Sequence, residues 1–301
     1  MKEKLPNFLI VGAAKCGTSS LHNYLNQHPD IFMPTYTDEG LKVKEPRFLI
    51  KEKVKERLPK GIWDLESYKL LFNKAVNEKA IGESTVLYLY FYQTAIKNIK
   101  KYLGNDVKII IMLRNPIERA YSAFLFASRT MQENLSFRDA LKNSTKRYNN
   151  DLSLSPMILY KELGLYYSMV KAYIENFKHV HCIIYDDFVT NTNEEVFKVF
   201  NFLNVNDKYN IDTSKVINSG GMLWNSNITK ELLMGRGVLK RIIKIITPKK
   251  VRIKTKKKLV KKFTSRAPEI DEDIRKKLFS FFNSDIRELE KLINRDLSVW
   301  R

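Results

Sequence analysis

The sequence predicts an α/β protein with a central, mainly parallel β-sheet flanked by helices, and a basic, helical C-terminal extension. Two runs, 8–11 and 107–113, are almost wholly apolar, which is typical of parallel strands buried on both faces. Each run is followed by a turn and then by a helical pattern, the order expected in a βα unit. In addition, apolar residues recur at helical spacing from 270 to 294, which predicts a long amphipathic helix near the C-terminus.

The segments between these landmarks fit the same class. Helices are expected at 19–26, 65–75, 90–103, 160–177 and 194–203, and further strands at 31–33, 79–85 and 180–185. The polar stretch 135–150 is expected to hold a helix followed by a loop, and its residues are expected to vary with the substrate.

Composition limits the possible functions. Lys and Arg number 53 and Asp and Glu 33, so the formal net charge of +20 predicts affinity for nucleotides, polyanions or acidic membranes. The length and a hydrophobic content of 44% are sufficient for one domain over 1–301 with a full core. Two cysteines, Cys16 and Cys182, exclude a disulfide framework and favour a reducing compartment. The sequence has no zinc-ligand spacing, and no metal is expected.

The turn after the first strand, GAAKCGTSS at 12–20, predicts an anion site. Backbone N–H groups of a glycine-bounded turn and of the following helix N-terminus converge, and the helix dipole adds positive potential. Gly12 and Gly17 have the Walker spacing, but Thr18 stands where the Walker lysine would follow and Lys15 lies inside the loop. This P-loop-like turn therefore suits a shorter anion. The alternative is an ordinary strand-to-helix crossover with a solvated Lys15.

A second anion-binding pattern follows the strand at 107–113. Pro116 suits the first position of a helix, so Ser122 lies within two turns of Arg114. Arginine suits phosphate because its planar fork contacts two oxygens at once, and the serine hydroxyl can add a third contact. Arg119 is expected to brace the loop through a salt bridge. The alternative is a helix with surface arginines.

Together the two patterns resemble those of sulfotransferases, which use 3′-phosphoadenosine 5′-phosphosulfate (PAPS) as sulfuryl donor. GAAKCGTSSL resembles the family's 5′-phosphosulfate loop, and the segment from Arg114 to Ser122 resembles its 3′-phosphate motif, Arg-x-Pro-x-x-Arg-x-x-Ser. The resemblance implies donor contacts from Lys15, Cys16, Gly17, Thr18, Ser19, Ser20, Arg114 and Ser122. It also implies that Lys15 contacts the oxygen between phosphate and sulfate and stabilises the departing phosphate, with the loop amides and without a metal.

The stretch Lys44-Glu45-Pro46-Arg47-Phe48 resembles the Lys-Glu-x-His-Phe-Phe segment of heparan-type sulfotransferases and their bacterial relatives. The resemblance implies that Glu45 is the general base that takes the proton of the acceptor. Arg47 replaces the common histidine and Leu49 the second phenylalanine, so the substrate contacts are expected to differ, whereas the carboxylate stays in register. Taken alone, the stretch also fits a charged loop followed by a core phenylalanine.

Three other residues remain open as the base. Glu83 precedes Ser84 and Thr85 at the end of the 79–85 strand, where the family often has Glu-Lys/Ser-Ser/Thr-Pro-x-Tyr, so it is expected at the carboxyl edge of the sheet. Simple capping of the strand explains this segment equally well. His22 and His28 are the other two, and His22, which is expected on the helix after the loop, fits a packed or solvated histidine better than a base.

Fourteen Lys and Arg residues and no acid occur between 236 and 266, within an insertion expected at about 230–266. The stretch 238–246 fits a basic amphipathic helix that stops before Pro248. A solvated face, a grip on a polyanionic acceptor and docking on an acidic membrane all remain open. The loop at 216–222 lacks the family's Arg-Lys-Gly triplet, so no adenine contacts are assigned.

The expected function is sulfuryl transfer from PAPS to a hydroxyl or amine of an acceptor, with a glycan or another carbohydrate-containing molecule favoured. Animal Golgi members carry an N-terminal anchor and stem before the donor loop, and few residues precede it here, so a cytoplasmic enzyme is expected, with peripheral membrane contact through 236–266 left open. No nucleic-acid partner is expected, and the oligomeric state is not predicted. The competing hypotheses are an ATP-dependent P-loop kinase and a non-catalytic protein that binds polyanions or membranes.

Overall fold

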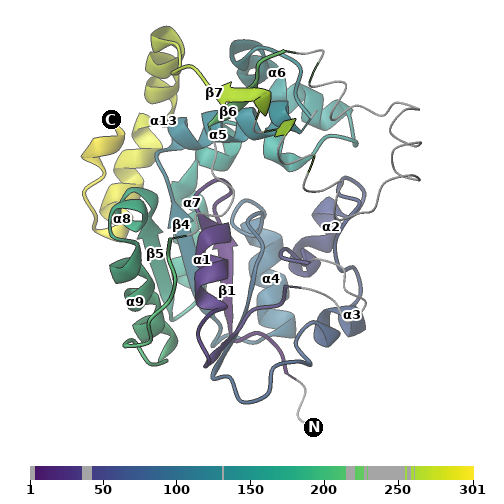
Figure 1. The fold of residues 1–301 in the computed structure, drawn as a ribbon, viewed down its shortest axis with the longest axis vertical. Coiled ribbons are helices and arrows are strands. Elements are labelled where there is room, and N and C mark those ends of the chain that lie inside the picture. The colour runs from purple at the N-terminus through teal and green to yellow at the C-terminus, as the bar shows by residue number, and fades with distance from the viewer. Residues whose placement is uncertain are drawn as a thin grey trace.

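The computed structural model describes residues 4–35, 43–130, 132–214, 221–226, 229, 255, 259–260 and 262–301. Its centre is a parallel sheet of five strands in the order β2-β3-β1-β4-β5 (Figure 1). The strands are β1 (Phe8–Gly12), β2 (Ile31–Phe32), β3 (Ala80–Ser84), β4 (Lys108–Leu113) and β5 (Val180–Ile184). After β1 the chain forms β2 and β3 on one side of β1, and it then crosses over to form β4 on the other side of β1. The carboxyl end of β1 is therefore where parallel sheets of this kind open a crevice.

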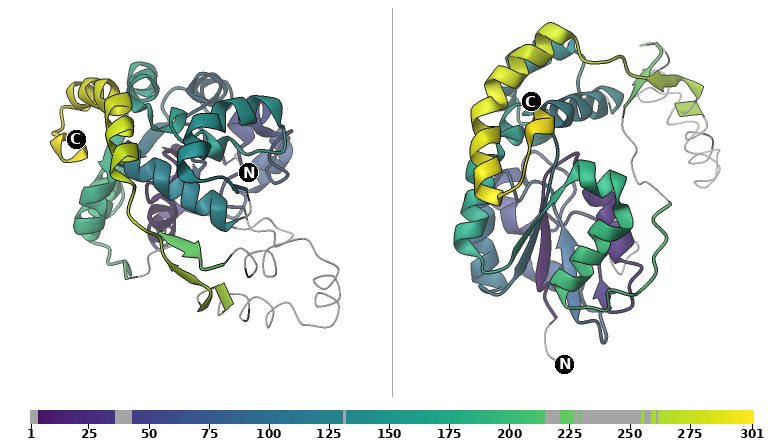
Figure 2. Two further views of the ribbon diagram at one scale, coloured as in Figure 1. Left: turned by 90° about the horizontal axis from the view of Figure 1, so that it is seen from above. Right: turned by 90° about the vertical axis from the view of Figure 1, so that its left-hand side faces the viewer.

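Helices cover both faces of the sheet, as the right-hand view of Figure 2 shows. One face carries α1 (Thr18–Leu25), α8 (Tyr185–Thr190) and α9 (Thr192–Leu203), and the opposite face carries α4 (Tyr92–Tyr102), α7 (Tyr166–Asn176) and α13 (Glu272–Ile293). Above the carboxyl ends of the strands in Figure 1 lie α5 (Pro116–Arg129) and α6 (Phe137–Asn150). The short helices α2 (Lys51–Val54) and α3 (Leu65–Leu70) lie on the β2 side, and single turns occur at η1 (Phe48–Ile50), η2 (Pro156–Ile158), η3 (Glu162–Gly164) and η4 (Ser298–Trp300).

The two apolar runs form the core of the sheet. Residues 8–11 of β1 and 109–113 of β4 have no exposed surface, as expected for strands with helices on both faces. Asn115 then caps α5 by accepting the N–H of Ile117, with Pro116 at the first helical position. The predicted fold class, a mainly parallel sheet flanked by helices, is confirmed.

Several predicted elements have different bounds in the structure, and the helix expected at 65–75, for example, ends at Leu70. The helix expected at 160–177 begins only at Tyr166, after η3, and the Asp285 carboxylate of α13 accepts the N–H groups of Tyr166 and Tyr167 at 2.7 and 3.2 Å. A carboxylate from a distant helix thus caps α7. The strand expected to reach Tyr185 ends at Ile184, and Tyr185 opens α8.

The end of the basic stretch is also different from its prediction. Thr264–Arg266 form a strand, β7, that pairs antiparallel with β6 (Met222–Trp224), and the Trp224 indole donates to the Arg129 carbonyl at the end of α5. Figure 2 shows this small sheet apart from the main one. Most of the predicted insertion, including the helix at 238–246, lies outside the described residues, as does the 216–222 loop up to residue 220. No helix in the described ranges is long and apolar enough to cross a lipid bilayer.

Candidate active site

A cavity of about 320 Å³ opens beside the carboxyl ends of β1 and β4. The structure brings nearly all the predicted site residues into its wall: Lys15, Gly17, Thr18, Ser19, Ser20, Glu45, Arg114 and Ser122. Four cationic side chains and one carboxylate, that of Glu45, occur among the described residues that line it. The excess of positive charge suits an anionic ligand.

The loop after β1 has the backbone that an anion cradle needs. Gly17 has a φ of 87°, in the left-handed region that favours glycine, and α1 begins at the next residue. A Cβ at Gly17 would lie 3.3 Å from the Tyr185 ring, so a larger residue would also crowd the wall of the cavity. The first turn of α1 contains no acidic residue, so its N-terminal N–H groups keep their positive potential for a ligand.

Lys15 reaches the cavity from this loop with its Nζ 4.4 Å from the centre of the Phe126 ring. Burial, reinforced by the positive charges of Arg129 and Arg114, lowers the pKa of Lys15 to about 8. An anion bound beside the ammonium would favour its charged form.

Arg114 and Ser122 also line the cavity, from the end of β4 and from α5. The guanidinium carbon of Arg114 lies 4.7 Å from the centre of the Tyr185 ring, a cation–π contact that holds the fork in place. The carbonyl of Arg114 accepts a hydrogen bond from the Tyr166 hydroxyl at 3.0 Å. Both the backbone and the side chain of Arg114 are therefore positioned by contacts with distant parts of the chain.

Glu45 lies on the segment that precedes η1, with 21% of its side chain exposed, which leaves the carboxylate accessible from the cavity. Its oxygens are 3.7 Å from Lys44 Nζ and from an Arg47 terminal nitrogen. Lys44 also donates to the Ser19 hydroxyl at 3.0 Å, which ties this segment to the start of α1. Arg47 donates to the Lys60 carbonyl.

Glu83, the first rival base, is fully buried and does not line the cavity. Its carboxylate accepts the hydroxyls of Tyr88 at 2.7 Å, Thr85 at 2.9 Å and Tyr68 at 3.0 Å. Burial raises the pKa of Glu83 to about 7, against the opposing effect of these three hydrogen bonds. A carboxylate that is enclosed by three hydroxyls and is not among the residues that line the cavity is better suited to a structural role than to contact with an acceptor.

The two histidines also lie away from the cavity. His28 accepts the N–H of Asp30 at 3.0 Å and contacts the Asn206 carbonyl at 2.9 Å, and its ring packs against Phe200 and Tyr209. His22 is buried on α1 and does not line the cavity. These positions favour packing roles for both residues.

Cys16 and Arg119 differ from their predicted places. The Cys16 side chain points into the core beside the Tyr166 hydroxyl, where burial raises its pKa to about 11, so its thiol is not part of the cavity wall. The salt bridge predicted for Arg119 is wrong: the fully buried guanidinium donates to the Tyr160 carbonyl, and no ion pair joins it to a carboxylate in the described part of the chain. Burial lowers its pKa.

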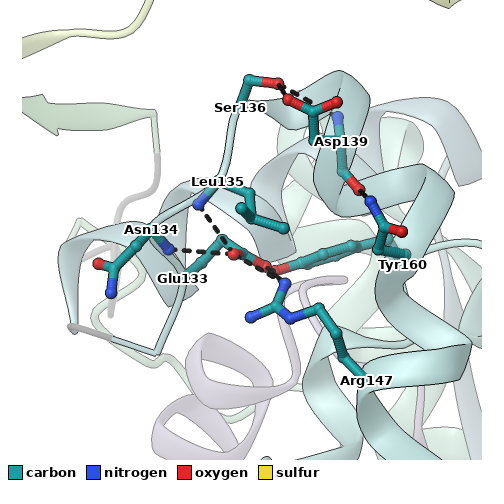
Figure 3. Close-up of polar contacts among 8 residues, drawn as sticks. Glu133, Asn134, Leu135, Ser136, Asp139, Arg147 and Tyr160 are labelled. Atoms are coloured by element: carbon teal, nitrogen blue, oxygen red, sulfur yellow. Dashed lines mark hydrogen bonds and ion pairs between the residues drawn. The ribbon is translucent and has the colours of Figure 1, made fainter.

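A partly buried ion pair between Glu133 and Arg147, which the sequence did not predict, fixes the segment between α5 and α6 (Figure 3). Both Glu133 oxygens accept from Arg147, at 2.8 and 2.9 Å, and one also accepts the Tyr160 hydroxyl at 2.9 Å. The other accepts the backbone N–H groups of Asn134 and Leu135. The pair thus joins α6 to the turn that carries both Tyr160 and the cavity residue Met157. No local pattern marks Glu133, because its partners come from three separate segments.

The comparisons with known proteins agree with this geometry. A family model for the sulfotransferase domain matches residues 5–219. The crystal structure of a sulfotransferase from Alicyclobacillus acidocaldarius superposes with a TM-score of 0.73 and 31% identity over 99% of both chains. Carbohydrate sulfotransferase 15 of Mus musculus is 25% identical over 67% of this chain and 44% of its own length. A membrane-associated sulfotransferase of Dictyostelium discoideum, kil1, is 28% identical over 44% of this chain and 25% of its own. The chain thus spans less than half the length of these curated relatives.

The parallel sheet, the glycine turn and the cationic cavity at the carboxyl ends of the strands define an α/β protein with a cavity suited to a phosphorylated ligand. The match over residues 5–219 makes the assignment specific. The chain belongs to the sulfotransferase family.

Proposed function

We propose that this sulfotransferase moves the sulfuryl group of PAPS to a hydroxyl or amine of a carbohydrate-containing acceptor. The observation that carries the proposal is the meeting of Lys15, Arg114 and Glu45 in one cavity, although they come from the ends of β1 and β4 and from the segment before η1. The cationic wall and the glycine turn fit a nucleotide with phosphates at both its 5′ and 3′ positions. The carbohydrate acceptor rests on similarity to the mouse relative named above.

In this mechanism each residue has a separate task. Bound PAPS would supply an activated sulfuryl group. Arg114 and Ser122 hold its 3′-phosphate, and the N–H groups of the loop with Thr18 hold the 5′ side. Glu45 accepts the proton of the acceptor while the new sulfur–oxygen or sulfur–nitrogen bond forms. Lys15 stabilises the charge left on the phosphate as the old bond breaks, which is where positioned charge contributes most to rate.

The test is the replacement Glu45→Gln, which keeps the shape of the side chain and removes its basicity. Affinity for adenosine 3′,5′-bisphosphate should stay close to wild type, whereas turnover should fall by roughly 10²–10⁴, the usual range for loss of a general base. Calorimetry measures binding, and mass gain of candidate sugars incubated with PAPS measures transfer.

Lys15→Ala serves as the comparison, because it should weaken donor binding as well as slow transfer. Unchanged turnover in Glu45→Gln would remove Glu45 from the role of base. Binding of ATP with magnesium in preference to the bisphosphate would instead favour a kinase.

A further inference from the structure

Beneath the cavity, the buried Glu83 carboxylate is connected to the backbone of the segment that carries Glu45. The Thr85 hydroxyl donates to Glu83 at 2.9 Å and accepts the N–H of Arg47 at 3.3 Å. The Tyr88 hydroxyl donates to Glu83 at 2.7 Å and accepts the N–H of Leu49 at 3.3 Å. Two hydroxyls thus bridge one carboxylate to two backbone amides.

The direction of these bonds follows from the charge of the carboxylate. An ionised carboxylate only accepts hydrogen bonds, so both hydroxyls must point their hydrogens at Glu83. Their lone pairs then face the amides of Arg47 and Leu49, which can only donate. Because Glu83 has no exposed surface, no water can replace these contacts at low cost.

We propose that Glu83, Thr85 and Tyr88 are positioning residues that hold the 45–49 backbone so that Glu45 faces the cavity. The inference rests on the proposed function for its effect on catalysis, but not for the positioning itself. Arg47 connects the positioning residues to Glu45. Its N–H donates to the Thr85 hydroxyl, and its guanidinium lies 3.7 Å from the Glu45 carboxylate. A displacement of Arg47 therefore displaces the partner of the base.

Tyr68 offers a matched control. Its hydroxyl donates to the same Glu83 oxygen as Tyr88, at 3.0 Å, but comes from α3 and makes no bond to the 45–49 backbone among the described contacts. Its ring stacks on Phe48 with centroids 4.5 Å apart, a contact that Tyr68→Phe retains. Tyr68→Phe and Tyr88→Phe thus each remove one hydroxyl from Glu83, and only the second removes an acceptor from the segment.

Amide hydrogen exchange at pH 8, above the pKa of about 7 of Glu83, tests the positioning without any substrate. Within a peptide that covers 45–50, the amide of Arg47 in Thr85→Val and that of Leu49 in Tyr88→Phe should exchange about tenfold faster, as expected for one lost hydrogen bond. Tyr68→Phe should stay within about twofold of wild type, and Thr85→Ser, which keeps the hydroxyl, should restore protection. Equal acceleration in Tyr68→Phe, or none in the other two, would overturn the proposal.

Kinetics on the same variants test the consequence for catalysis. In Thr85→Val and Tyr88→Phe, kcat should fall at least tenfold while the Kd for adenosine 3′,5′-bisphosphate stays unchanged, because misplacing a reacting group by about 1 Å can cost this much. Normal kcat in both variants would overturn the catalytic part. A wild-type enzyme that transfers no sulfuryl group would instead refute the proposed function, and the exchange measurement would still decide the positioning.

Discussion

Lys15 is a partly desolvated amine among positive neighbours, and burial with the charges of Arg129 and Arg114 lowers its pKa to about 8. Below this pH it is an ammonium and attracts an anion, and above it the attraction is lost. Affinity for adenosine 3′,5′-bisphosphate should therefore fall as the pH rises from 7 to 9.5, by at least about tenfold for the loss of one charge-assisted contact.

In Lys15→Arg this fall in affinity between pH 7 and 9.5 should vanish, because a guanidinium stays charged throughout that range. Calorimetry at a series of pH values measures both proteins. The same pH profile in the arginine variant would assign the titration to another group.

A second prediction concerns Arg114, whose guanidinium is held at the cavity wall by its contact with the Tyr185 ring. Arg114→Ala should weaken binding of adenosine 3′,5′-bisphosphate by ~1.5–3 kcal/mol, the value of a hydrogen bond to a charged group. Binding of adenosine 5′-phosphate, which lacks the 3′ group, is the control and should change little. If the variant kept its preference for the 3′-phosphate, Arg114 would not be the residue that binds it.

At the scale of elements, the packing of β1 beside β3 depends on a glycine, Gly82. Gly82 is the register partner of Phe8, and a Cβ there would lie 2.2 Å from the Phe8 ring. Gly82→Ala should lower the free energy of unfolding by about 1–3 kcal/mol, the usual effect of overpacking a core. Urea denaturation measures the loss.

The control is a double variant that combines Gly82→Ala with Phe8→Leu, because the smaller leucine side chain makes room for the added methyl group. The double variant should be more stable than the sum of the two single changes predicts. Simple additivity would show that the ring is not what excludes the side chain.

For the whole molecule, the uneven distribution of charge is the main feature. Fourteen of the 53 Lys and Arg residues fall within 236–266, and most of that stretch lies outside the described residues. We propose that it provides contact with a polyanionic acceptor or an acidic membrane surface. Neutralising four of its lysines should lower retention on heparin and on acidic vesicles, and raising the salt should do the same because dissolved ions screen electrostatic attraction beyond ~8–10 Å. The four are Lys254, Lys256, Lys257 and Lys258.

The control removes the same charge from exposed positions elsewhere, at Lys53, Lys55, Lys142 and Lys146. It should alter retention much less, and both variants should keep their affinity for adenosine 3′,5′-bisphosphate. Equal losses in the two variants would mean that only net charge matters.

The sequence alone determined the elements whose cause is local. An unbroken apolar run needs two covering layers, so β1 and β4 were predictable. The Gly17 turn and Pro116 start their helices through their own backbone preferences, which placed Lys15 and Arg114 each at the end of a buried strand. The family was also predictable, because each motif that resembles those of sulfotransferases is contiguous in the chain.

Only the tertiary structure decided which buried polar groups find partners. Asp285 caps α7 across 119 positions of sequence, and Arg119 donates to a carbonyl where a salt bridge was expected. Glu83 lies below the cavity because three hydroxyls from two segments enclose it, whereas Glu45 remains at the cavity wall. The reason is that the cost of burying a charge depends on donors that the fold brings from afar, and neither periodicity nor spacing in the sequence records them.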